Sequence, residues 1–357
     1  MSENFPAELL ARLPGLLVPW FLRAKRDLEW RNDPTPYRVW ISEIMLQQTR
    51  VEAVKPYYDR FLAELPDVAA LAAVDETRLL KLWEGLGYYR RVRNLQAAAK
   101  KIVQEHGGVF PDDYDGVRGL PGIGDYTAGA ILSIAFGKPF PAVDGNVLRV
   151  ATRLAASRED IDAPKLRKEL NSALAAVYPA GQCSEFTQSL MELGATVCLP
   201  NGAPLCTVCP LAGICLASQR GLTDEIPVRK AKAARPVKEF AVIVLRNAEG
   251  RFAVRRRPET GLLAGLYEFP NLEGRRSETA LKTAFRAGRI RKAGTAKHIF
   301  THVEWAMTLY LAETADPPGG FEWVPRAALQ TETAIPSAFK AALKLALDPD
   351  SFQGGKP

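Results

Sequence analysis

The chain has 357 residues, of which 47% are hydrophobic, and a formal net charge of +7. This length exceeds the usual limit of one hydrophobic core, so we expect two domains. No apolar run is long enough to cross a membrane, and the amino end lacks the basic start and apolar core of a secretory signal. With only five cysteines in the chain, we predict a cytoplasmic protein.

The positive charge is unevenly distributed. Lys and Arg balance Asp and Glu at 27 each over residues 1–230, whereas residues 231–357 carry 20 against 13. An excess of this kind suits a polyanionic partner such as nucleic acid, and a soluble cationic surface is the alternative.

The first part of the chain shows helical spacing. Apolar residues recur three and four apart, which predicts an all-α domain over residues 1–220. The charged stretch 221–236 has no periodic apolar face and is predicted to be a linker. The predicted helices cover residues 8–28, 38–49, 51–65, 91–106, 125–136, 145–156, 164–178 and 184–195.

The pattern changes after the linker. Strand-like runs and two helical segments predict an α+β domain over residues 237–347, followed by a flexible tail over 348–357. The strands are expected at 239–246, 251–256, 297–302 and 304–311, and the helices at 277–287 and 335–346.

Four cysteines fall within eighteen residues and indicate one metal site. Spacing alone leaves a structural zinc and an iron–sulfur cluster equally open. The fifth cysteine, Cys183, has a helical context and is expected to be a small buried residue. The four clustered cysteines are Cys198, Cys206, Cys209 and Cys215.

A glycine-rich turn precedes the helix expected at 125–136. Gly122 and Gly124 allow close approach of the backbone to a ligand, and the first N–H groups of the helix can bind a phosphate. A simple turn between helices is the alternative. Asp144 lies twenty residues beyond Gly124, at the expected start of the next helix.

The turn, Asp144 and the cysteine tail together resemble the helix–hairpin–helix DNA glycosylases, a superfamily that includes endonuclease III. Residues 42–49, 85–89 and 143–147 resemble its adenine DNA glycosylase branch. The resemblance covers the chain from residue 8 to about residue 345. It implies one [4Fe–4S] cluster on the four cysteines. It also implies a monomer that acts in base excision repair on double-stranded DNA, removing adenine opposite 8-oxoguanine or guanine.

Two carboxylates carry the implied chemistry. Glu43 shares the apolar face of its helix with Val39, Trp40 and Leu46, which should raise its pKa and allow it to protonate the adenine ring. Helix position alone would favour a solvated surface glutamate. Asp144 can accept backbone N–H bonds at a helix start, which favours its ionised form. The resemblance assigns it the stabilisation of the cationic sugar, and a plain N-cap is the alternative.

Tyr126 distinguishes two kinds of glycosylase. The endonuclease III branch has at this position a lysine whose amine attacks the sugar, and a phenol cannot form that Schiff base. The sequence therefore predicts hydrolysis by water without strand scission. Asn146 is expected to orient Asp144 or the water, with solvation of the first helical turn as the alternative.

The resemblance also implies DNA contacts, because a base in a duplex must be flipped out before it can react. Four residues would enter the helix around the extruded adenine, although Leu86 and Tyr88 could also be ordinary core residues beside a turn. Three more would line the pocket or touch the opposite strand. The first set is Gln48, Thr49, Leu86 and Tyr88, and the second is Arg26, Trp30 and Arg31.

The second domain contains residues 261–270, which resemble the entry of Nudix hydrolases. The metal-binding box that should follow is absent, because residues 277–288 supply a single glutamate, so pyrophosphatase activity is not expected. In adenine glycosylases this domain inspects 8-oxoguanine with a Phe-Ser-His loop. Phe300, Thr301 and His302 stand at that place, and Thr301 keeps the hydroxyl.

Two features leave alternatives open. The loop 199–205 between the first two cysteines is one residue longer than the family pattern and carries no basic side chain, which puts its contact with DNA in doubt. The alternative functions are a bifunctional endonuclease III-like enzyme acting on oxidised pyrimidines, a non-catalytic iron–sulfur DNA-binding protein and, least favoured, a Nudix hydrolase.

Overall fold

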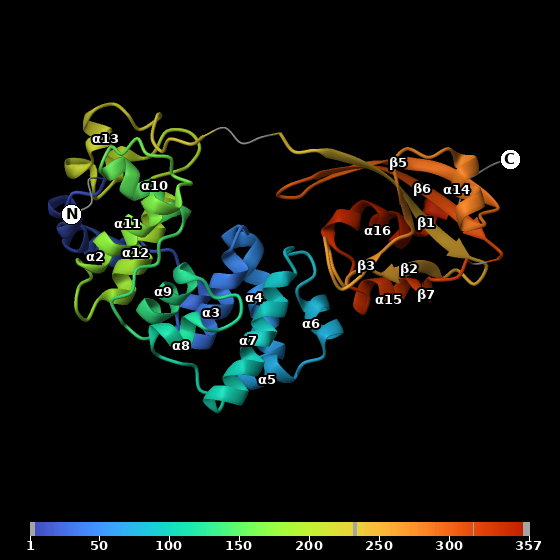
Figure 1. The fold of residues 1–357 in the computed structure, drawn as a ribbon, viewed down its shortest axis with the longest axis horizontal. Coiled ribbons are helices and arrows are strands. Elements are labelled where there is room, and N and C mark those ends of the chain that lie inside the picture. Colours follow the sequence, from blue (N-terminus) through green and yellow to red (C-terminus); the bar gives the residue numbers. More distant parts are fainter. Residues whose placement is uncertain (1–3, 231–233, 317, 353–357) are drawn as a thin grey trace. The chain divides into compact units, whose positions relative to one another are not determined.

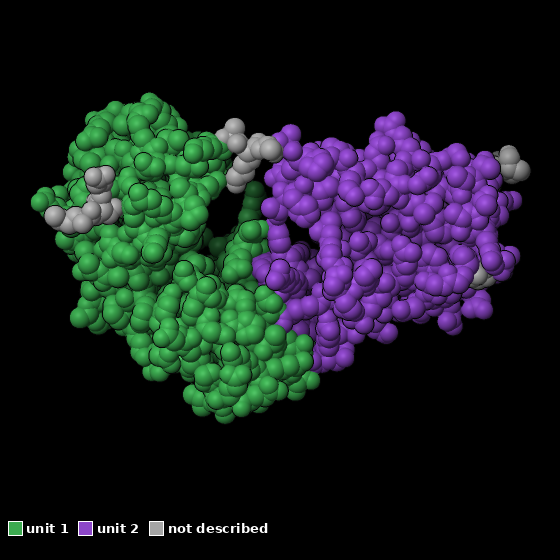
Figure 2. Space-filling model, in the orientation of Figure 1, with its two compact units in different colours: residues 1–73, 94–232 green, residues 74–93, 233–357 purple. Residues whose placement is uncertain are grey.

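The computed structural model describes residues 4–230, 234–316 and 318–352, which form two compact units. The first unit comprises residues 1–73 and 94–232, and the second comprises residues 74–93 and 233–357 (Figure 2). Among the described residues, no helix is both long and apolar enough to span a bilayer.

The first unit is helical, as predicted (Figure 1). The helix expected over 8–28 is divided at Arg12 into α1 and α2, and the chain becomes extended at Lys25. The short helices α5 and α8 were not predicted, because one or two turns give too little periodicity. Its helices are α1 (Ala7–Ala11), α2 (Leu13–Ala24), η1 (Glu29–Arg31), α3 (Pro36–Leu46), α4 (Val51–Glu64), α5 (Val68–Ala73), α8 (Tyr114–Arg118), α9 (Asp125–Ile134), α10 (Gly145–Leu154), α11 (Pro164–Ala175), α12 (Cys183–Thr196), η2 (Cys206–Val208), η3 (Ala212–Ile214) and α13 (Leu216–Gln219).

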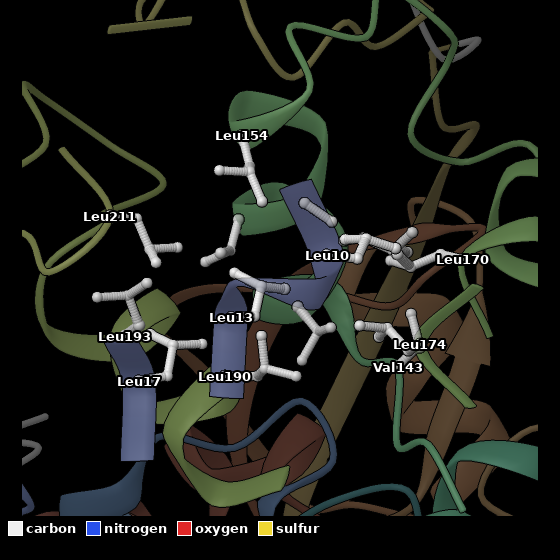
Figure 3. Packing of buried hydrophobic residues seen from close by; sticks show 14 of the residues in the cluster. Leu10, Leu13, Leu17, Val143, Leu154, Leu170, Leu174, Leu190, Leu193 and Leu211 are labelled. Atoms are coloured by element: carbon white, nitrogen blue, oxygen red, sulfur yellow. The ribbon is translucent and has the colours of Figure 1, made fainter. Parts of the chain in front are cut away.

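A leucine-rich core joins α1 and α2 to α10, α11 and α12 (Figure 3). Each fully buried leucine contributes about 1.5–3 kcal/mol relative to an exposed one. The core therefore fixes α12 against both α2 and α10, while α9 packs against both α3 and α12. Its members include Leu10, Leu13, Leu17, Leu154, Leu170, Leu174, Leu190 and Leu193.

The second unit is built on a mixed sheet with the order β3-β2-β1-β6-β5. Strand β1 pairs in parallel with β6, and β6 pairs antiparallel with β5. Strand β4 pairs with β1, and β7 pairs with β2. The strands are β1 (Val237–Asn247), β2 (Phe252–Arg256), β3 (Tyr267–Glu268), β4 (Asn271–Glu273), β5 (Arg289–Ile299), β6 (Glu304–Thr314) and β7 (Glu322–Val324).

Both faces of this sheet are covered. Val242 and Val244 of β1 belong to the core that contains residues of α16, whereas Ile243 and Leu245 belong to the core that contains residues of α14. This explains why β1 is a continuous apolar run and lacks the alternation of a half-exposed strand. The remaining elements are α6 (Glu76–Leu82), the start of α7 (Arg90–His106), α14 (Glu278–Phe285), α15 (Arg326–Thr331), η4 (Ser337–Phe339), α16 (Lys340–Leu347) and η5 (Pro349–Phe352).

Two segments expected to be irregular are partly packed. In the predicted linker, Ile226 is buried, and its carbonyl accepts a hydrogen bond from Arg153 Nε at 2.7 Å. In the predicted tail, residues 349–352 form η5, and the Phe352 ring lies edge-on to Phe252 at 6.0 Å. Residues 231–233 and 353–357 of these two segments lie outside the described residues.

Candidate active site

A cavity of about 670 Å³ in the first unit gathers the predicted catalytic residues and several predicted DNA contacts. Its walls come from η1, α3, α9, α10 and α12, with the turn after α3. All four predicted catalytic residues reach it, together with most of the predicted DNA contacts of this unit. These residues are Arg26, Trp30, Arg31, Glu43, Gln48, Thr49, Tyr126, Asp144 and Asn146.

Glu43 lies on the buried face of α3. The helix begins at Pro36 after Thr35, whose side chain accepts the N–H of Arg38. Only 7% of Glu43 is exposed. Burial raises its pKa to about 7, against a smaller lowering by the hydrogen bond from Tyr126. This is the direction that its helical position predicts, and it leaves much of the carboxyl protonated near neutral pH.

Tyr126 meets Glu43 from the first turn of α9. Its hydroxyl donates a hydrogen bond to a Glu43 carboxylate oxygen, and burial raises the pKa of the phenol, which therefore stays protonated. The preceding turn requires glycine at residue 122, where φ is +77° and a Cβ would lie 2.6 Å from the side chain of Asn94. A Cβ at Gly124 would meet open space.

Asp144 is the N-cap of α10. Its carboxylate accepts the Val147 N–H and the Asn146 side-chain amide, each at 2.7 Å. The Asn146 oxygen in turn accepts Arg149 Nη2 at 2.8 Å. The predicted cap is present, but the pKa of Asp144 is raised, because burial outweighs the hydrogen bonds and the Arg149 charge that favour the ionised form.

Glu192 is a site residue that the sequence reasoning missed. Its carboxylate is fully buried and accepts Arg26 N, Nε and Nη2 and Arg31 Nη2, at 2.7–2.9 Å. These four bonds explain why the pKa of Glu192 falls to about 2 despite burial. They also fix both predicted pocket arginines. The sequence offers one indication of this role. Glu192 stands between Met191 and Leu193, which both pack against the core, so a charged residue at this place needs a buried partner.

The four clustered cysteines line a second, small cavity of about 30 Å³ in the same unit. Among the described residues no carboxylate or imidazole lines it, and its lining combines the four thiols with apolar residues, Arg153, Ser218 and Thr223. Burial raises the pKa of Cys209 to about 11. In the parts of the chain that the structure describes, no three His, Cys, Asp or Glu side chains are arranged to hold a single metal ion.

Two arginines of α10 form hydrogen bonds with the start of the uncharged loop 199–205 and with the cysteine before it. Arg153 Nη1 donates to Leu199 O at 2.9 Å and contacts Cys198 Sγ at 3.3 Å, and Arg149 Nε donates to Cys198 O at 2.9 Å. Cys183 is 3% exposed at the start of α12, which confirms the expectation of a small buried residue.

The remaining predicted DNA contacts lie in the second unit. Leu86 is buried, whereas Tyr88 is 52% exposed with φ of +48°. The Tyr88 hydroxyl lies 3.4 Å from Thr301 Oγ1, so two predicted contacts distant in sequence come together. Thr301 and His302 are exposed between β5 and β6, while Phe300 packs edge-on against Trp305 at 4.9 Å.

Known protein families match residues in both units. A family model described as "HhH-GPD superfamily base excision DNA repair protein" covers residues 41–176, and a NUDIX domain model covers residues 241–345. Adenine DNA glycosylase of Mus musculus is 35% identical, over 86% of this chain and 73% of the relative. The Homo sapiens enzyme of the same name is 31% identical, over 96% of this chain and 74% of the relative.

Solved structures resemble the helical part. A thermostable thymine-DNA glycosylase aligns with a TM-score of 0.54 and 26% identity, over 60% of this chain and 98% of its own. Endonuclease III in a non-covalent DNA complex aligns with a TM-score of 0.52 and 25% identity, over 61% of this chain and 98% of its own.

Proposed function

Because the chain belongs to the adenine DNA glycosylase family, we propose that it hydrolyses the bond between adenine and deoxyribose in duplex DNA, the first step of base excision repair. One observation carries this proposal. A buried glutamate with a pKa of about 7, bonded to a buried phenol, shares a cavity with a second carboxylate at a helix N-terminus. Such a pair supplies a neutral acid and an anion, which glycosidic cleavage requires.

Glu43 begins the reaction as the general acid. It transfers its proton to a ring nitrogen of the extruded adenine, and the electron pair of the glycosidic bond then moves onto the base as the bond breaks. Tyr126 holds the Glu43 carboxyl in position and stabilises the carboxylate left after transfer, because the phenol donates to it. The departing base is neutral, and the sugar is left as a cation.

Asp144 serves the second half of the reaction. Its negative charge stabilises the cationic sugar, and the carboxylate then accepts a proton from the water that attacks C1′. The Val147 N–H, the Asn146 amide and the Arg149 charge favour the ionised form that this role needs. The products are free adenine and an abasic deoxyribose, so one water is consumed.

The site provides for hydrolysis without strand scission. Tyr126 occupies the position at which a bifunctional enzyme needs an amine. The nearest downstream lysine, Lys138, forms an ion pair with Asp112 at 2.9 Å after the end of α9, and it does not line the cavity.

Arg26 and Arg31 act in the pocket as oriented cations. Glu192 fills its acceptor positions with their N–H groups, so it orients the arginines and has little capacity left for a ligand. Gln48 lies in the turn after α3 with φ of +60°, and Thr49 follows it at the cavity edge. This turn is suited to enter the space that an extruded adenine leaves.

The four cysteines are proposed to bind one [4Fe–4S] cluster. Four thiols gathered around one cavity match the ligand type that such clusters take. The bound cluster would cross-link the chain after α12 to the segments η2 and η3. Binding must release thiol protons, since burial raises the pKa of Cys209 and Cys215.

The second unit is proposed to recognise 8-oxoguanine opposite the target adenine. Thr301 and His302 present a hydroxyl and an imidazole at an exposed turn, and Tyr88 lies beside Thr301. These polar groups can contact the edge of a base, while cationic side chains of this unit neutralise phosphates. Thr301 retains the hydroxyl that the family loop uses.

Base release from three duplexes tests the proposal. Adenine should be released opposite 8-oxoguanine and opposite guanine, and the DNA should be cut only after alkali treatment. A duplex containing thymine glycol should remain intact. Strand cleavage without alkali would contradict the monofunctional assignment, and release of thymine glycol in place of adenine would contradict the substrate assignment.

A further inference from the structure

Two charged residues at the end of α6 connect residues 74–93 to the C-terminal part of the second unit. Lys81 Nζ lies 2.5 Å from Glu84 Oε2 and donates to Thr333 O at 3.1 Å and Leu329 O at 3.4 Å. Glu84 Oε1 accepts the Ile335 N–H at 2.8 Å. The side chains of Lys81 and Glu84 are 10% and 22% exposed. This is a partly buried ion pair in which each member also bonds to backbone far away in sequence.

Each charged side chain contacts backbone groups of the opposite polarity. Lys81 binds a carbonyl near the C-terminal end of α15 and another just beyond it, where backbone carbonyls lack helical partners and carry partial negative charge. Glu84 satisfies a backbone N–H of the segment that follows. Removing either charge leaves the other partly buried without its partner, which is more damaging than losing an exposed ion pair.

A second anchor lies beyond the loop. Arg93 Nη1 donates to Ala264 O at 2.8 Å, and Arg93 Nε pairs with Glu76 Oε1 at 2.7 Å. Residues 85–88 are therefore bracketed by contacts with residues 264 and 329–335. The loop carrying Leu86 and Tyr88 is thus fixed on both sides to the same part of the chain that carries Thr301.

The loop itself is internally constrained. Gly85, Gly87 and Tyr88 have φ of +102°, +71° and +48°. Trp83 Nε1 donates to Gly87 O at 3.0 Å, and Arg91 Nη2 donates to Leu86 O and Gly87 O at 3.1 and 3.2 Å. Because its backbone carbonyls are bound on both sides, the loop should follow its anchors as one body.

We propose that Lys81 and Glu84 are positioning residues, which fix the Leu86–Tyr88 loop to the C-terminal part of the chain so that Tyr88 and Thr301 enter the duplex together. The proposal rests on the proposed function. It means that the C-terminal part supports base extrusion opposite every partner base, in addition to recognising 8-oxoguanine.

The test uses the full-length protein and duplexes with 2-aminopurine beside the target adenine, since its fluorescence rises when the neighbouring base unstacks. Glu84→Ala should slow both unstacking and base release by about tenfold, because a small misplacement of a positioning group is costly. The rates should fall by the same factor whether 8-oxoguanine or guanine lies opposite the target adenine. Glu84→Gln keeps an acceptor for the Ile335 N–H but leaves Lys81 without its charge partner, so it should restore part of the rate.

The matched control is Glu313→Ala, which removes the ion pair of Arg246 between β1 and β6 of the same unit; its rates should equal those of the wild type. If Glu84→Ala does not fold, Lys81→Gln takes its place, with the same expectation. Unchanged unstacking in a folded Glu84→Ala protein would overturn the proposal, as would equal slowing by Glu84→Ala and Glu84→Gln. A wild type that unstacks DNA but releases no adenine would contradict the proposed function alone.

Discussion

Glutamine in place of Glu43 should abolish adenine release and also stabilise the protein at alkaline pH. The amide keeps the shape of the side chain and can still accept the Tyr126 hydrogen bond, but it has no acidic proton to give. Burial opposes the charge of the native carboxylate. The same physical feature that makes Glu43 an acid therefore lowers stability whenever Glu43 is ionised.

The size of the effect follows from the pKa. A rise from 4.5 to about 7 corresponds to about 3 kcal/mol, since one pKa unit is about 1.4 kcal/mol. Because the folded-state pKa of Glu43 is raised, this contribution to the free energy of unfolding is fully present below pH 4.5. It is lost as the pH rises through 7. The amide of the Glu43→Gln protein does not titrate, so the stability gained over wild type should be larger near pH 8.5 than near pH 5, by about 2–3 kcal/mol.

Urea unfolding of both proteins at the two pH values measures this difference. Glu52→Gln is the matched control, because the Glu52 side chain is 81% exposed on α4. The difference in stability between this variant and the wild type should be the same at both pH values. Wild-type adenine release should fall as the pH rises through about 7. A Glu43→Gln protein that releases adenine normally, or whose gain is the same at both pH values, would refute the reasoning.

Three further predictions concern the other groups. Asp144→Asn should be nearly inactive in single-turnover base release while α10 persists by circular dichroism, because an amide oxygen can still cap the Val147 N–H. Cys209→Ser should lower the iron content from about four per chain and yield poorly folded protein, whereas Cys183→Ser should keep the iron, as measured by metal analysis. His302→Ala should lower the preference for 8-oxoguanine over guanine, measured as a ratio of rates, with little change in nonspecific DNA affinity.

The long helices and the central strands could be predicted because their apolar periodicity extends over several turns or residues. The expected strands at 239–246 and 304–311 are present within β1 and β6. The elements β3, β4 and β7 have two or three residues each and exist through their pairing partners, so no local pattern marks them. The split between α1 and α2, in contrast, has a local signal, because Pro14 in the first turn of α2 lacks the N–H that would continue α1.

The sequence located both proposed catalytic carboxylates and predicted the raised pKa of Glu43, but it did not predict the raised pKa of Asp144. The helix start at Asp144 predicted the hydrogen bonds, and these are present. The net direction of the pKa of Asp144 depends on how deeply the fold buries the carboxylate, which is a tertiary property. Glu192 was missed for the same reason, since its role depends on arginines more than 160 residues away.

The assignment of residues 74–93 to the second unit was also beyond the sequence. Lys81 and Glu84 have the i, i+3 spacing of an ordinary surface ion pair, and nothing in the local sequence distinguishes them from one. The proposed role of the pair depends on backbone carbonyls of residues 329 and 333 and on the backbone N–H of residue 335. Every residue other than proline has such backbone groups, so the pattern of side chains in the sequence cannot predict which of them will bind Lys81 or Glu84.

In the proposed reaction, the cavity must keep one carboxyl neutral and the other ionised although burial raises the pKa of both. Hydrogen bonding provides the difference. Asp144 receives two N–H donors from the first turn of α10, with Arg149 beyond them, whereas Glu43 receives a phenol from the first turn of α9. Amide donors at a positive helix end stabilise an anion, while a phenol of raised pKa stabilises it less. The two helix starts therefore separate the acid from the anion within one apolar cavity.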